Sequence, residues 1–351
     1  MPHPSSSNVV ISVSEAPFEP MEARLVDELP AGPGWQFEPK WDGFRCLAVK
    51  RAGEVALFAK SGKPLARYFP DVAETVRQLP ADEFVLDGEL VIPVDGRLSF
   101  DALQMRLHPA ESRVRRLVAE HPAILIVFDL PVAPGATALL MAPLTERRVA
   151  LEHFIIPGLA GVRLSPATTE RAVAEDWLAG SGVSLDGVIA KRLDALYVPG
   201  EREMLKVKRI RSADCVVGGF RYGTNSKLVG SLLLGLYDDA GLLNHVGFTS
   251  MISDRERQPL TEKLEALAGN PGFTGRAPGG PSRWSTERTG SYEKLRHELV
   301  VEVLYDQVTG DRFRHGTRLV RWRPDKAPRQ CRIEQITGAG DPPDPYAVML
   351  E

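Results

Sequence analysis

The sequence predicts an α+β domain of antiparallel sheets with flanking helices, followed by a small all-β barrel domain. The chain has 351 residues, which is enough for two or three domains with a core in each. In the first part, strand and helix patterns mix without strict alternation, which favours antiparallel sheets over a doubly wound parallel sheet. From Asp214 onward, short strands with a single helix suit a Greek-key barrel. We therefore expect domains over residues 1–211 and 212–351.

The first domain opens with a predicted hairpin and a predicted helix. The stretch FRCLAVKRAGEVALFAK reads as two alternating strands that meet at Ala52 and Gly53. The stretch FPDVAETVRQLP places its apolar residues on one helical face behind Asp71, which we predict to be the N-cap.

The remaining elements of the first domain follow from the same patterns. We predict helices at residues 100–107 and 111–120, divided by Pro109, and two more that begin near Thr145 and Thr169, the last ending at Gly180. We predict strands at residues 83–93, 124–130, 185–192 and 203–209.

The second domain has the pattern of a barrel of the oligonucleotide-binding kind. It contains short strand runs such as CVVGGFRYG, LLLGLYD and LVVEVLYDQVT, and one helix around LTEKLEALAG. The stretch NPGFTGRAPGGPS reads as a long surface loop.

Composition places the chain among ordinary globular proteins. It is 43% hydrophobic and 25% charged, with a formal net charge of −3. The three cysteines, Cys46, Cys215 and Cys331, are far apart and in no CxxC spacing, so neither a disulfide framework nor a zinc site is indicated. The N-terminus lacks a leader pattern and no window has the apolar length of a membrane span. We expect a cytoplasmic protein without a membrane partner.

One segment is strongly basic. Between Arg312 and Arg332 the chain carries eight basic residues and a single acid, Asp325. This run is a candidate electrostatic footprint for phosphate.

The stretch EPKWDGFR raises the question of whether Lys40 is an exposed lysine before a turn or a nucleophile. A lysine amine has an ordinary pKa of about 10.4, so attack at neutral pH needs neighbouring cations or a metal ion to lower that value. On residue type alone, the exposed lysine is the more common case.

Five other short motifs supply such neighbours, although each alone has a plain structural reading as a turn, a core aromatic or a solvated loop. In order they are Asp87-Gly88-Glu89, Phe128-Asp129, Asp186-Gly187-Val188-Ile189-Ala190-Lys191, Lys206-Val207-Lys208 and Arg323-Pro324-Asp325-Lys326. Lys206 and Lys208 alternate on one strand, so their ammonium groups share a face. They can neutralise an α-phosphate and lower the pKa of Lys40. Glu89 and Asp186 can position a ribose and a Mg²⁺ ion, which prefers oxygen ligands.

The ordered set KWDGFR, LDGELV, VFDL, LDGVIAK, LKVKR and RWRPDK resembles the nucleotidyltransferase motifs of ATP-dependent DNA ligases, mRNA capping enzymes and RNA ligases. The resemblance runs from Glu38 to Lys326. Within that superfamily the chain is similar to the small bacterial DNA ligase C group and to the ligase module of bacterial end-joining enzymes. This resemblance implies a nucleotidyltransferase (adenylation) domain followed by an OB-fold domain.

The resemblance also implies roles for matching residues. Lys40 would form a lysyl-AMP intermediate, Glu38 would face the adenine amino group and Phe128 would stack on the base. Arg45 and Glu89 would hold the ribose.

The phosphates would be met by residues from the later motifs. Lys191 belongs to the nucleotide-binding set, Lys206 and Lys208 would contact the α-phosphate, and the pyrophosphate would be met by Arg323, Asp325 and Lys326. Asp42 and Gly43 complete the first motif.

Two positions depart from the family pattern. Asp186 stands where most relatives have glutamate, which makes a water-mediated metal contact the expectation. Lys60, in AKSGKPL, stands where relatives usually carry arginine, so a bidentate phosphate contact is not expected there.

The expected reaction is the sealing of nicked double-stranded DNA with ATP as substrate and Mg²⁺ or Mn²⁺ as the metal, through lysyl-AMP and 5′-adenylated DNA. The resemblance implies a monomer that acts in DNA repair or recombination, alongside a primase-polymerase or other repair proteins. A capping guanylyltransferase, an RNA ligase and a noncatalytic nucleic-acid-binding protein remain the alternatives.

Overall fold

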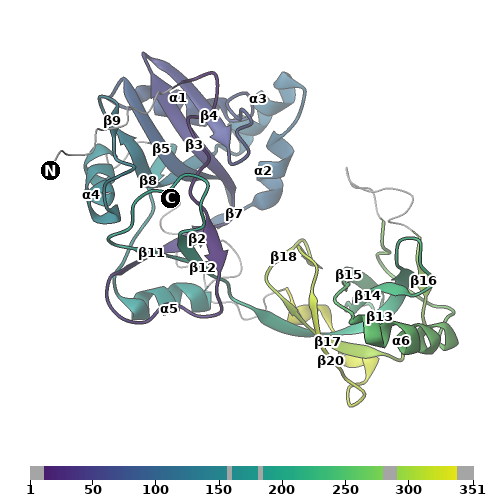
Figure 1. Ribbon diagram of the computed structural model, residues 1–351. Helices are drawn as coiled ribbons and strands as arrows, with labels where there is room; N and C mark the ends of the chain where they lie inside the picture. The colour runs from purple at the N-terminus through teal and green to yellow at the C-terminus, as the bar shows by residue number, and fades with distance from the viewer. Residues whose placement is uncertain (1–11, 156–159, 181–184, 280–290, 338–351) are drawn as a thin grey trace. The chain divides into compact units, whose positions relative to one another are not determined.

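The computed structural model describes residues 12–155, 160–180, 185–279 and 291–337. The chain divides into two compact units, with the boundary in sequence between Arg209 and Ile210 (Figure 1). Each unit has its own hydrophobic core. Parts of both predicted domains lie outside the described residues, namely residues 1–11, 156–159 and 181–184 of the first and residues 283–290 and 338–351 of the second. Residues 280–282 of the expected loop also lie outside them.

The larger sheet of the first unit has the strand order β10-β8-β5-β3-β4, with β9 paired to β8. Its strands are β3 (Phe44–Arg51), β4 (Glu54–Ala59), β5 (Glu83–Val91), β8 (Ile124–Ala133), β9 (Thr137–Ala138) and β10 (Val162–Leu164). β3 and β4 form the predicted hairpin, and Ala52 and Gly53 in its turn both have positive φ. The hairpin prediction is therefore confirmed.

The smaller sheet of the first unit has the order β1-β12-β11-β2. Its strands are β1 (Ala23–Leu25), β2 (Trp35–Trp41), β11 (Leu185–Arg192) and β12 (Met204–Val207). A short separate hairpin is formed by β6 (Pro93–Val94) and β7 (Arg97–Leu98).

The prediction of purely antiparallel sheets is wrong at two sheet edges. β1 pairs parallel with β12, and β10 pairs parallel with β8. A parallel pair needs a crossover connection, and helix α4 (Leu144–Phe154) lies in the segment that joins β8 to β10. Both added strands have only three residues, which is too short for an alternating pattern to be read from sequence.

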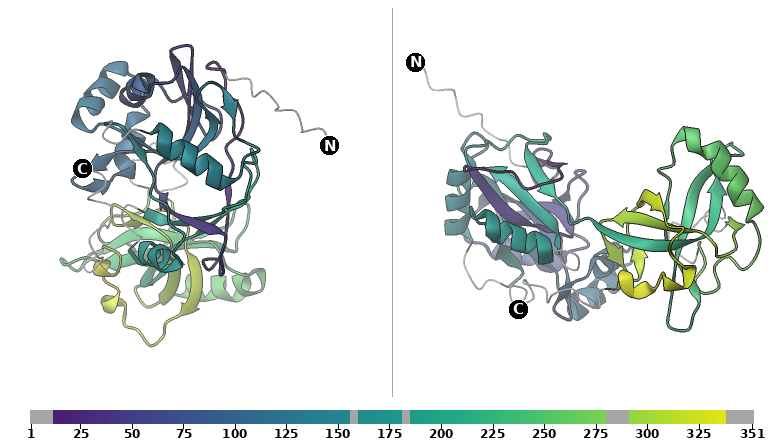
Figure 2. Two further views of the ribbon diagram at one scale, coloured as in Figure 1. Left: turned by 90° about the vertical axis from the view of Figure 1, so that its left-hand side faces the viewer. Right: turned by 90° about the horizontal axis from the view of Figure 1, so that it is seen from below.

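Helices cover both sheets of the first unit. They are α1 (Pro70–Gln78), α2 (Phe100–Arg106), α3 (Glu111–Glu120), α4 and α5 (Arg171–Gly180). α4 packs on β8 and α1 on β4 of the larger sheet, whereas α5 packs on β11 and β2 of the smaller one (Figures 1 and 2). The predicted division at Pro109 is confirmed. α5 is helical as far as Gly180, the last described residue of that stretch.

Asp71 is not the N-cap of α1, contrary to the prediction. The N-cap is Phe69, and Pro70 occupies the first helical turn. The Asp71 carboxylate instead pairs with Arg106, whose side chain is fully buried, at 2.9 Å, and accepts a hydrogen bond from the Ala123 amide at 2.8 Å. Since a buried guanidinium needs a counterion, this pairing determines where the carboxylate lies.

The second unit is built around a sheet of order β15-β14-β13-β17-β20, with β16 paired to β13. Its elements are β13 (Arg211–Tyr222), β14 (Val229–Tyr237), β15 (Leu243–Thr249), α6 (Asp254–Ala266), β16 (Glu293–Lys294), β17 (Val300–Tyr305), β18 (Val308–Thr309), β19 (Arg312–Phe313), β20 (Arg318–Trp322), and the short 3₁₀ helices η1 (Pro328–Gln330) and η2 (Ile333–Gln335). α6 packs on β14, and β18 pairs with β19 as a hairpin.

The two ends of this strand order meet. Thr249, the last residue of β15, forms a parallel bridge with Thr317, just before β20. The Thr317 amide donates to the Phe248 carbonyl at 3.0 Å, and the Thr249 hydroxyl donates to the Thr317 carbonyl at 2.9 Å. Contact between the edge strands closes the sheet on itself, which protects edges that would otherwise be exposed.

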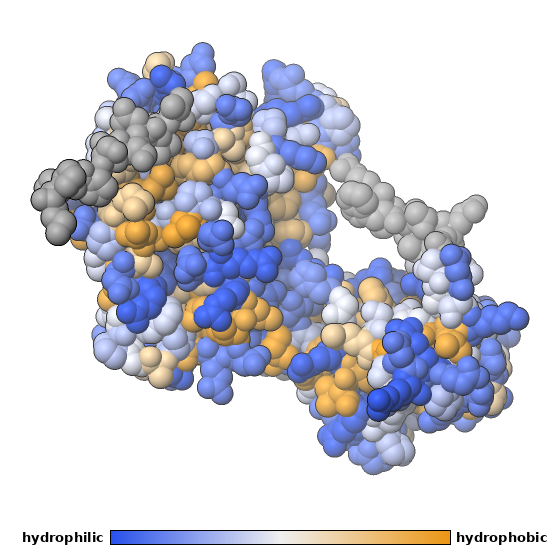
Figure 3. Space-filling view, viewed as in Figure 1, coloured by the Kyte–Doolittle hydropathy of each residue, from blue (hydrophilic) through white to orange (hydrophobic). Residues whose placement is uncertain are grey.

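The face of the molecule in Figure 3 is largely hydrophilic, interrupted by small hydrophobic patches on both units. None of the described helices has the length and hydropathy needed to cross a bilayer.

Candidate active site

The smaller sheet aligns the side chains of three motifs. Ile189 on β11 lies directly opposite Lys206 on β12 and Glu38 on β2. Directly opposite residues point to the same face of a sheet, and so do residues two apart on one strand. Glu38, Lys40 and Lys206 therefore share one face.

Gly187 lies opposite Lys40 and has a φ of 141°. A Cβ atom there would lie 2.0 Å from the Val207 carbonyl oxygen, so any larger residue would force the strands apart. Gly43 has a related role in the turn after Lys40, since its Cβ would lie 2.1 Å from the Leu90 carbonyl oxygen. Glycine at both positions allows the backbone to pack closely around the lysine.

The larger sheet contributes the other residues of the site. Arg45 on β3 lies directly across from Glu89 on β5. Between β5 and β8 the register shifts so that Phe128 is an extra residue, a bulge of the kind that redirects a side chain.

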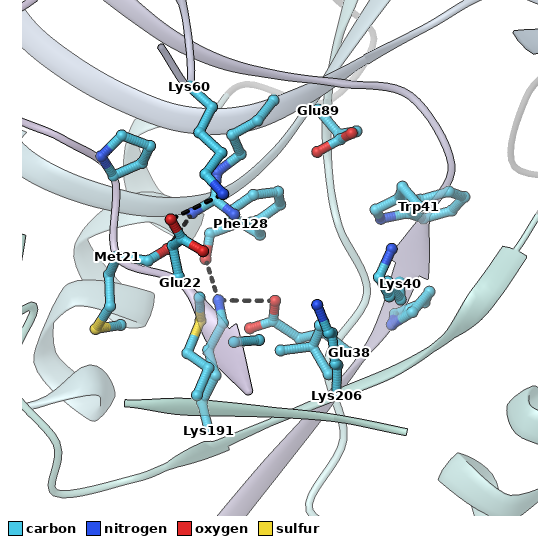
Figure 4. Close-up of a pocket in the computed structure, with 16 residues that line it drawn as sticks. Met21, Glu22, Glu38, Lys40, Trp41, Lys60, Glu89, Phe128, Lys191 and Lys206 are labelled. Carbon is cyan, nitrogen blue, oxygen red and sulfur yellow. Dashed lines mark hydrogen bonds and ion pairs between the residues drawn. The ribbon is translucent and has the colours of Figure 1, made fainter. Parts of the chain in front are cut away.

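Together the two sheets line a pocket that is open to solvent on one side (Figure 4). The amines of Lys40, Lys191 and Lys206 point into it from the strands of the smaller sheet. Of the predicted site residues, those that line the pocket are Glu38, Lys40, Arg45, Lys60, Glu89, Phe128, Lys191 and Lys206.

Asp186 holds two lysines at once. Its two carboxylate oxygens pair with the amine of Lys40 and, at 3.1 Å, with the amine of Lys208. The Asp186 side chain is 6% exposed, whereas that of Lys40 is 22% exposed. The carboxylate thus fixes the amine of Lys40 while leaving part of it accessible from the pocket.

Lys206 adds a third cation beside this group. Burial lowers the pKa of Lys206, and the ammonium groups of Lys40 and Lys208 lower it further, while Asp186 opposes the change. Several cations gathered around one carboxylate leave local positive charge, which favours an anionic ligand.

Glu38 is a buried carboxylate held from both sides. Lys191 lies 2.8 Å from one of its oxygens, and Gln36 donates to the other at 2.7 Å. The Lys191 amine also donates to the Phe128 carbonyl at 3.2 Å. An ionised carboxylate has about four acceptor positions, so Glu38 can still accept a hydrogen bond from a ligand.

Phe128 is packed against cations. The Arg45 guanidinium lies 4.6 Å and the Lys191 amine 4.9 Å from its ring centroid, distances typical of cation–π contacts. Arg45 in turn makes a two-pronged pair with Asp87, at 2.5 and 2.6 Å. Asp87 also accepts from the Tyr197 hydroxyl at 2.7 Å.

A second buried ion pair involves Asp129, the residue that follows Phe128 in sequence. The carboxylate of Asp129 pairs with Arg147 at 2.7 Å, and both side chains are 2% exposed or less. Arg147 and then Lys191 hold the pKa of Asp129 below its usual value, despite the opposing effect of burial, which is the largest single contribution. Arg147 also donates to the Ala142 and Ala195 carbonyls at 2.7 and 2.9 Å.

Sequence reasoning did not assign roles to Asp87, Asp129, Arg147 and Tyr197. A signal was present for the two acids, because each lies inside an otherwise apolar strand run, where a carboxylate must have a buried partner. No short motif identified Arg147 or Tyr197 as those partners.

Glu89 is a pocket carboxylate whose pKa is strongly raised. Burial raises the pKa of Glu89 to about 7, against the opposing effects of Arg45 and Lys40, and Asp42 and Asp87 add to the rise. Near neutral pH this group can therefore be present in both the acid and the carboxylate form.

Lys60 lies at the rim of the pocket, where its amine pairs with Glu22 at 2.8 Å. Of the two predicted metal ligands, Glu89 lines the pocket, whereas both carboxylate oxygens of Asp186 are already paired with lysine amines. In the part of the chain that the structure describes, no group of three or more His, Cys, Asp or Glu side chains is arranged for a metal ion. Mg²⁺ is commonly held by one or two carboxylates together with substrate phosphates, so Glu89 is available to it directly and Asp186 only through water.

Arg323, Asp325 and Lys326 belong to the second unit and are not among the residues that line the pocket. There, Asp214 pairs with Arg323 at 2.9 Å and with Lys326 at 2.5 Å. Arg323 also pairs with Asp325 at 2.8 Å, and hydrogen bonding from Arg323 lowers the pKa of Asp325 to about 2.

The basic run is thus less open than its sequence suggests. Several of its members are already paired with carboxylates, namely Arg321, Arg323, Lys326 and Arg332.

Comparison with known proteins identifies the family of the chain. Residues 20–208 match the model of the ATP dependent DNA ligase domain, and residues 225–326 match that of the ATP dependent DNA ligase C terminal region. The chain belongs to the ATP-dependent DNA ligase family.

Its relatives place this ligase in the bacterial ligase C type. It is 43% identical over 338 residues to DNA ligase C2 of Mycolicibacterium smegmatis, covering 91% of this chain and 94% of that protein. It is 40% identical over 338 residues to DNA ligase C of Mycobacterium tuberculosis, with the same coverage of both proteins. The family prediction from the six motifs is therefore confirmed.

A solved structure from a study of Lig E DNA ligases matches this ligase with a TM-score of 0.51 at 17% identity. The match covers 86% of this chain and 99% of that one, and it supports a shared fold.

Proposed function

We propose that this ligase seals nicks in duplex DNA by three nucleotidyl transfers in which Lys40 is the nucleophile. The observation that carries this proposal is the Lys40 amine itself, fixed by Asp186 and partly open to a pocket lined by cations and an aromatic ring. In the first transfer the Lys40 nitrogen bonds to the α-phosphorus of ATP and the bond to pyrophosphate breaks. AMP then passes to the 5′-phosphate at the nick, and the 3′-hydroxyl displaces it.

The adenosine portion fits the residues between the two sheets. Glu38 can accept a hydrogen bond from the adenine amino group, because Lys191 and Gln36 leave acceptor positions on its carboxylate. Phe128 provides an aromatic surface for the base. Glu89 and Arg45, opposite each other on neighbouring strands, are placed to hold the ribose.

The phosphates fit the cationic side of the pocket. Lys206 and Lys208 stabilise negative charge on the α-phosphate, and Lys60 supplies a single-point contact at the rim. Glu89 and Asp186 would hold a Mg²⁺ or Mn²⁺ ion together with the phosphates, and the bound ion would supply further neutralisation of the developing charge. Because phosphoryl transfer needs little proton shuttling, positioning and electrostatics supply most of the catalysis.

We assign residues 1–211 as the adenylation domain and residues 212–351 as an OB-fold domain, a division two residues away from the boundary between the two units at Arg209 and Ile210. The strand order of the second unit, its parallel closure at Thr249 and Thr317, and α6 between the third and fourth long strands in sequence support the OB-fold assignment. Arg323, Asp325 and Lys326 would meet the pyrophosphate after a rotation about residues 209–213, a step of the kind by which domain closure completes many active sites.

Nicked duplex DNA would be bound mainly through its phosphates, so binding should weaken with salt and depend little on sequence. We propose that the ligase acts as a monomer in DNA repair, alongside a primase-polymerase or other repair proteins.

The test is transfer of label from ATP to protein to DNA. The purified ligase, pretreated with pyrophosphate to remove any bound AMP, is incubated with Mg²⁺ and ATP or GTP labelled on the α-phosphate. We expect protein label with ATP alone, and transfer of that label to a 5′-phosphorylated nick in duplex DNA. Label from GTP would favour a capping guanylyltransferase, transfer only to nicked RNA would favour an RNA ligase, and no label on folded protein would favour a noncatalytic binding protein.

A further inference from the structure

A four-residue segment, residues 165–168, connects the two sheets of the first unit. It begins directly after β10, where the Ser165 amide donates to the Val127 carbonyl of β8 in the larger sheet at 2.8 Å. It ends at Thr168, which exchanges two backbone hydrogen bonds with Phe37 of β2 in the smaller sheet, at 2.7 and 3.0 Å. Because a residue spans at most about 3.6 Å, so short a segment holds the two sheets close together.

Ser165 is buried and is held through both its backbone and its side chain. Its carbonyl accepts a hydrogen bond from Arg148 of α4 at 2.9 Å. Its hydroxyl oxygen accepts from the indole Nε1 of Trp41 at 2.9 Å and lies 3.5 Å from the Pro166 carbonyl. A hydroxyl can accept and donate at once, so these two contacts are compatible. The Ser165 hydroxyl therefore presents a fixed acceptor to the Trp41 indole.

Trp41 connects Ser165 to Lys40. It is the last residue of β2 and directly follows Lys40, and both residues line the pocket (Figure 4). The buried Trp41 ring belongs to an apolar cluster with Val91 of β5 and Ile126 of β8, which are both strands of the larger sheet. The end of β2 that carries Lys40 is therefore packed on the larger sheet through Trp41.

The distance between the sheets matters because the reacting groups come from both of them. Lys40 lies on the smaller sheet, whereas Arg45, Glu89 and Phe128, the residues assigned to the ribose and the base, lie on the larger one. Asp186 also lies on the smaller sheet, so its ion pair with Lys40 does not determine the distance between the sheets. A displacement of about 1 Å between reacting groups can cost about 100-fold in rate.

We propose that Ser165 is a positioning residue for Lys40, because its hydroxyl holds Trp41 against the larger sheet and so sets the distance from the Lys40 amine to the bound nucleotide. Ser165 lies outside the six nucleotidyltransferase motifs. Its role rests on the proposed function, because it assumes that Lys40 attacks ATP. No bond forms or breaks at Ser165, so its effect should be confined to the step in which Lys40 is the nucleophile.

The experiment compares two steps of the reaction in the full-length ligase. Self-adenylation uses Lys40 and is measured in single turnovers with ATP labelled on the α-phosphate, after pyrophosphate pretreatment. Sealing of a nick that is already adenylated forms no bond to Lys40. For Ser165→Ala, which removes the acceptor of the Trp41 indole, the rate of self-adenylation at saturating ATP should fall by about 10-fold. The KM for ATP and the rate of sealing should each stay within about twofold of the parent values, because the residues that contact the nucleotide and the DNA are unchanged.

The matched control is Ser99→Ala. It removes a serine hydroxyl of the same unit that accepts from the Ala102 amide at the start of α2, and Ser99 does not line the pocket. Both steps should run at the parent rates in this variant.

A double-mutant cycle tests whether the hydroxyl acts through Trp41. Trp41→Phe keeps an aromatic ring but has no N–H, so it should slow self-adenylation more than sealing, as Ser165→Ala does. Adding Ser165→Ala to Trp41→Phe should cost less than about twofold more, because the hydrogen bond is already absent. Trp41→Phe also retains the buried hydroxyl, so it tests the proposal even where Ser165→Ala fails to fold.

Three results would overturn the role of Ser165 while the parent still takes label. The first is a Ser165→Ala variant that self-adenylates as fast as Ser99→Ala. The second is an equal slowing of both steps, which would mean that Ser165 contributes only to the stability of the fold. The third is a double variant in which the two losses multiply, which would mean that the hydroxyl does not act through Trp41. A folded parent that takes no label at all would instead remove the proposed function, and the role of Ser165 with it.

Discussion

Two places in this ligase use one carboxylate to hold two cations. Beside the pocket of the first unit, Asp186 pairs with Lys40 and Lys208. In the second unit, Asp214 pairs with Arg323 and Lys326. The two arrangements differ in what surrounds them.

The pocket has a further cation, Lys206, whereas the cluster around Asp214 has further acids, since Arg323 also pairs with Asp325 and lies 3.8 Å from Glu302. Positive charge in excess marks the place where phosphate is expected. Arg323 and Lys326 must break their ion pairs with these carboxylates before they can bind a phosphate. Removing one carboxylate from each place should distinguish these two states.

The largest difference should appear in stability. Asp129→Ala leaves Arg147 without its counterion in a buried site, and we expect a loss of about 3–5 kcal/mol in the free energy of unfolding. Asp325→Ala removes a pair whose carboxylate is 63% exposed and screened by solvent, so the loss should be far smaller. Urea denaturation of both variants beside the parent provides the measurement. Equal losses would show that burial does not distinguish the two regions.

The next effect concerns the position of the nucleophile. Asp186→Asn removes the charge that fixes Lys40, and we expect the rate of self-adenylation at saturating ATP to fall by about 100-fold. Asp194→Asn, which disturbs only a surface pair with Arg192, is the matched control. Single-turnover labelling with ATP measures the rate. An unchanged rate in Asp186→Asn would mean that Lys40 is positioned by other contacts.

Glu89 predicts a pH dependence of stability. Its pKa is about 7 in the folded chain and 4.5 as the ordinary value, so between these pH values the folded state holds a proton that the unfolded state has lost. The free energy of unfolding should therefore fall, by roughly 2 kcal/mol, as pH rises from 4.5 to 7. Glu89→Gln cannot titrate and should lose that part of the dependence. Denaturation curves at several pH values test this, and identical profiles for the two proteins would contradict the assignment.

The smallest effect concerns the second unit. Asp214→Asn weakens the ion pairs with Arg323 and Lys326, so less free energy is needed to free these cations to bind the phosphates of ATP. The KM for ATP in self-adenylation should therefore fall by about threefold. Sealing of DNA that is already adenylated should not change. The control is Asp239→Asn, which loses an exposed pair with Arg332. A higher KM in Asp214→Asn would instead mean that Asp214 prepares the two cations for their ligand.

The motifs predicted the family and most of the pocket lining because each is a short stretch whose chemistry is visible in the chain. Glu38 and Lys40 are two residues apart on one strand, so their shared face follows from local geometry. The hairpin at Ala52 and Gly53 was predictable for the same reason.

Partners that come from elsewhere in the chain could not be predicted. Asp87 meets Tyr197, and Asp214 meets Lys326, across more than a hundred residues, and those meetings depend on strand register. The same limit explains Asp71, which looked like a local helix cap but pairs with Arg106 on another helix. The two parallel edge strands, β1 and β10, were too short to carry a pattern.

The most direct test of the account is to find where AMP is attached. The parent ligase, Lys40→Ala, and Lys227→Ala as an exposed-lysine control are incubated with Mg²⁺ and ATP labelled on the α-phosphate after pyrophosphate pretreatment. The labelled protein is then digested and its peptides are mapped. The account predicts label on the parent and on Lys227→Ala, confined to the peptide that contains Lys40, and none on Lys40→Ala. Label that persists in Lys40→Ala, or that maps to another lysine of the pocket such as Lys206, would contradict it.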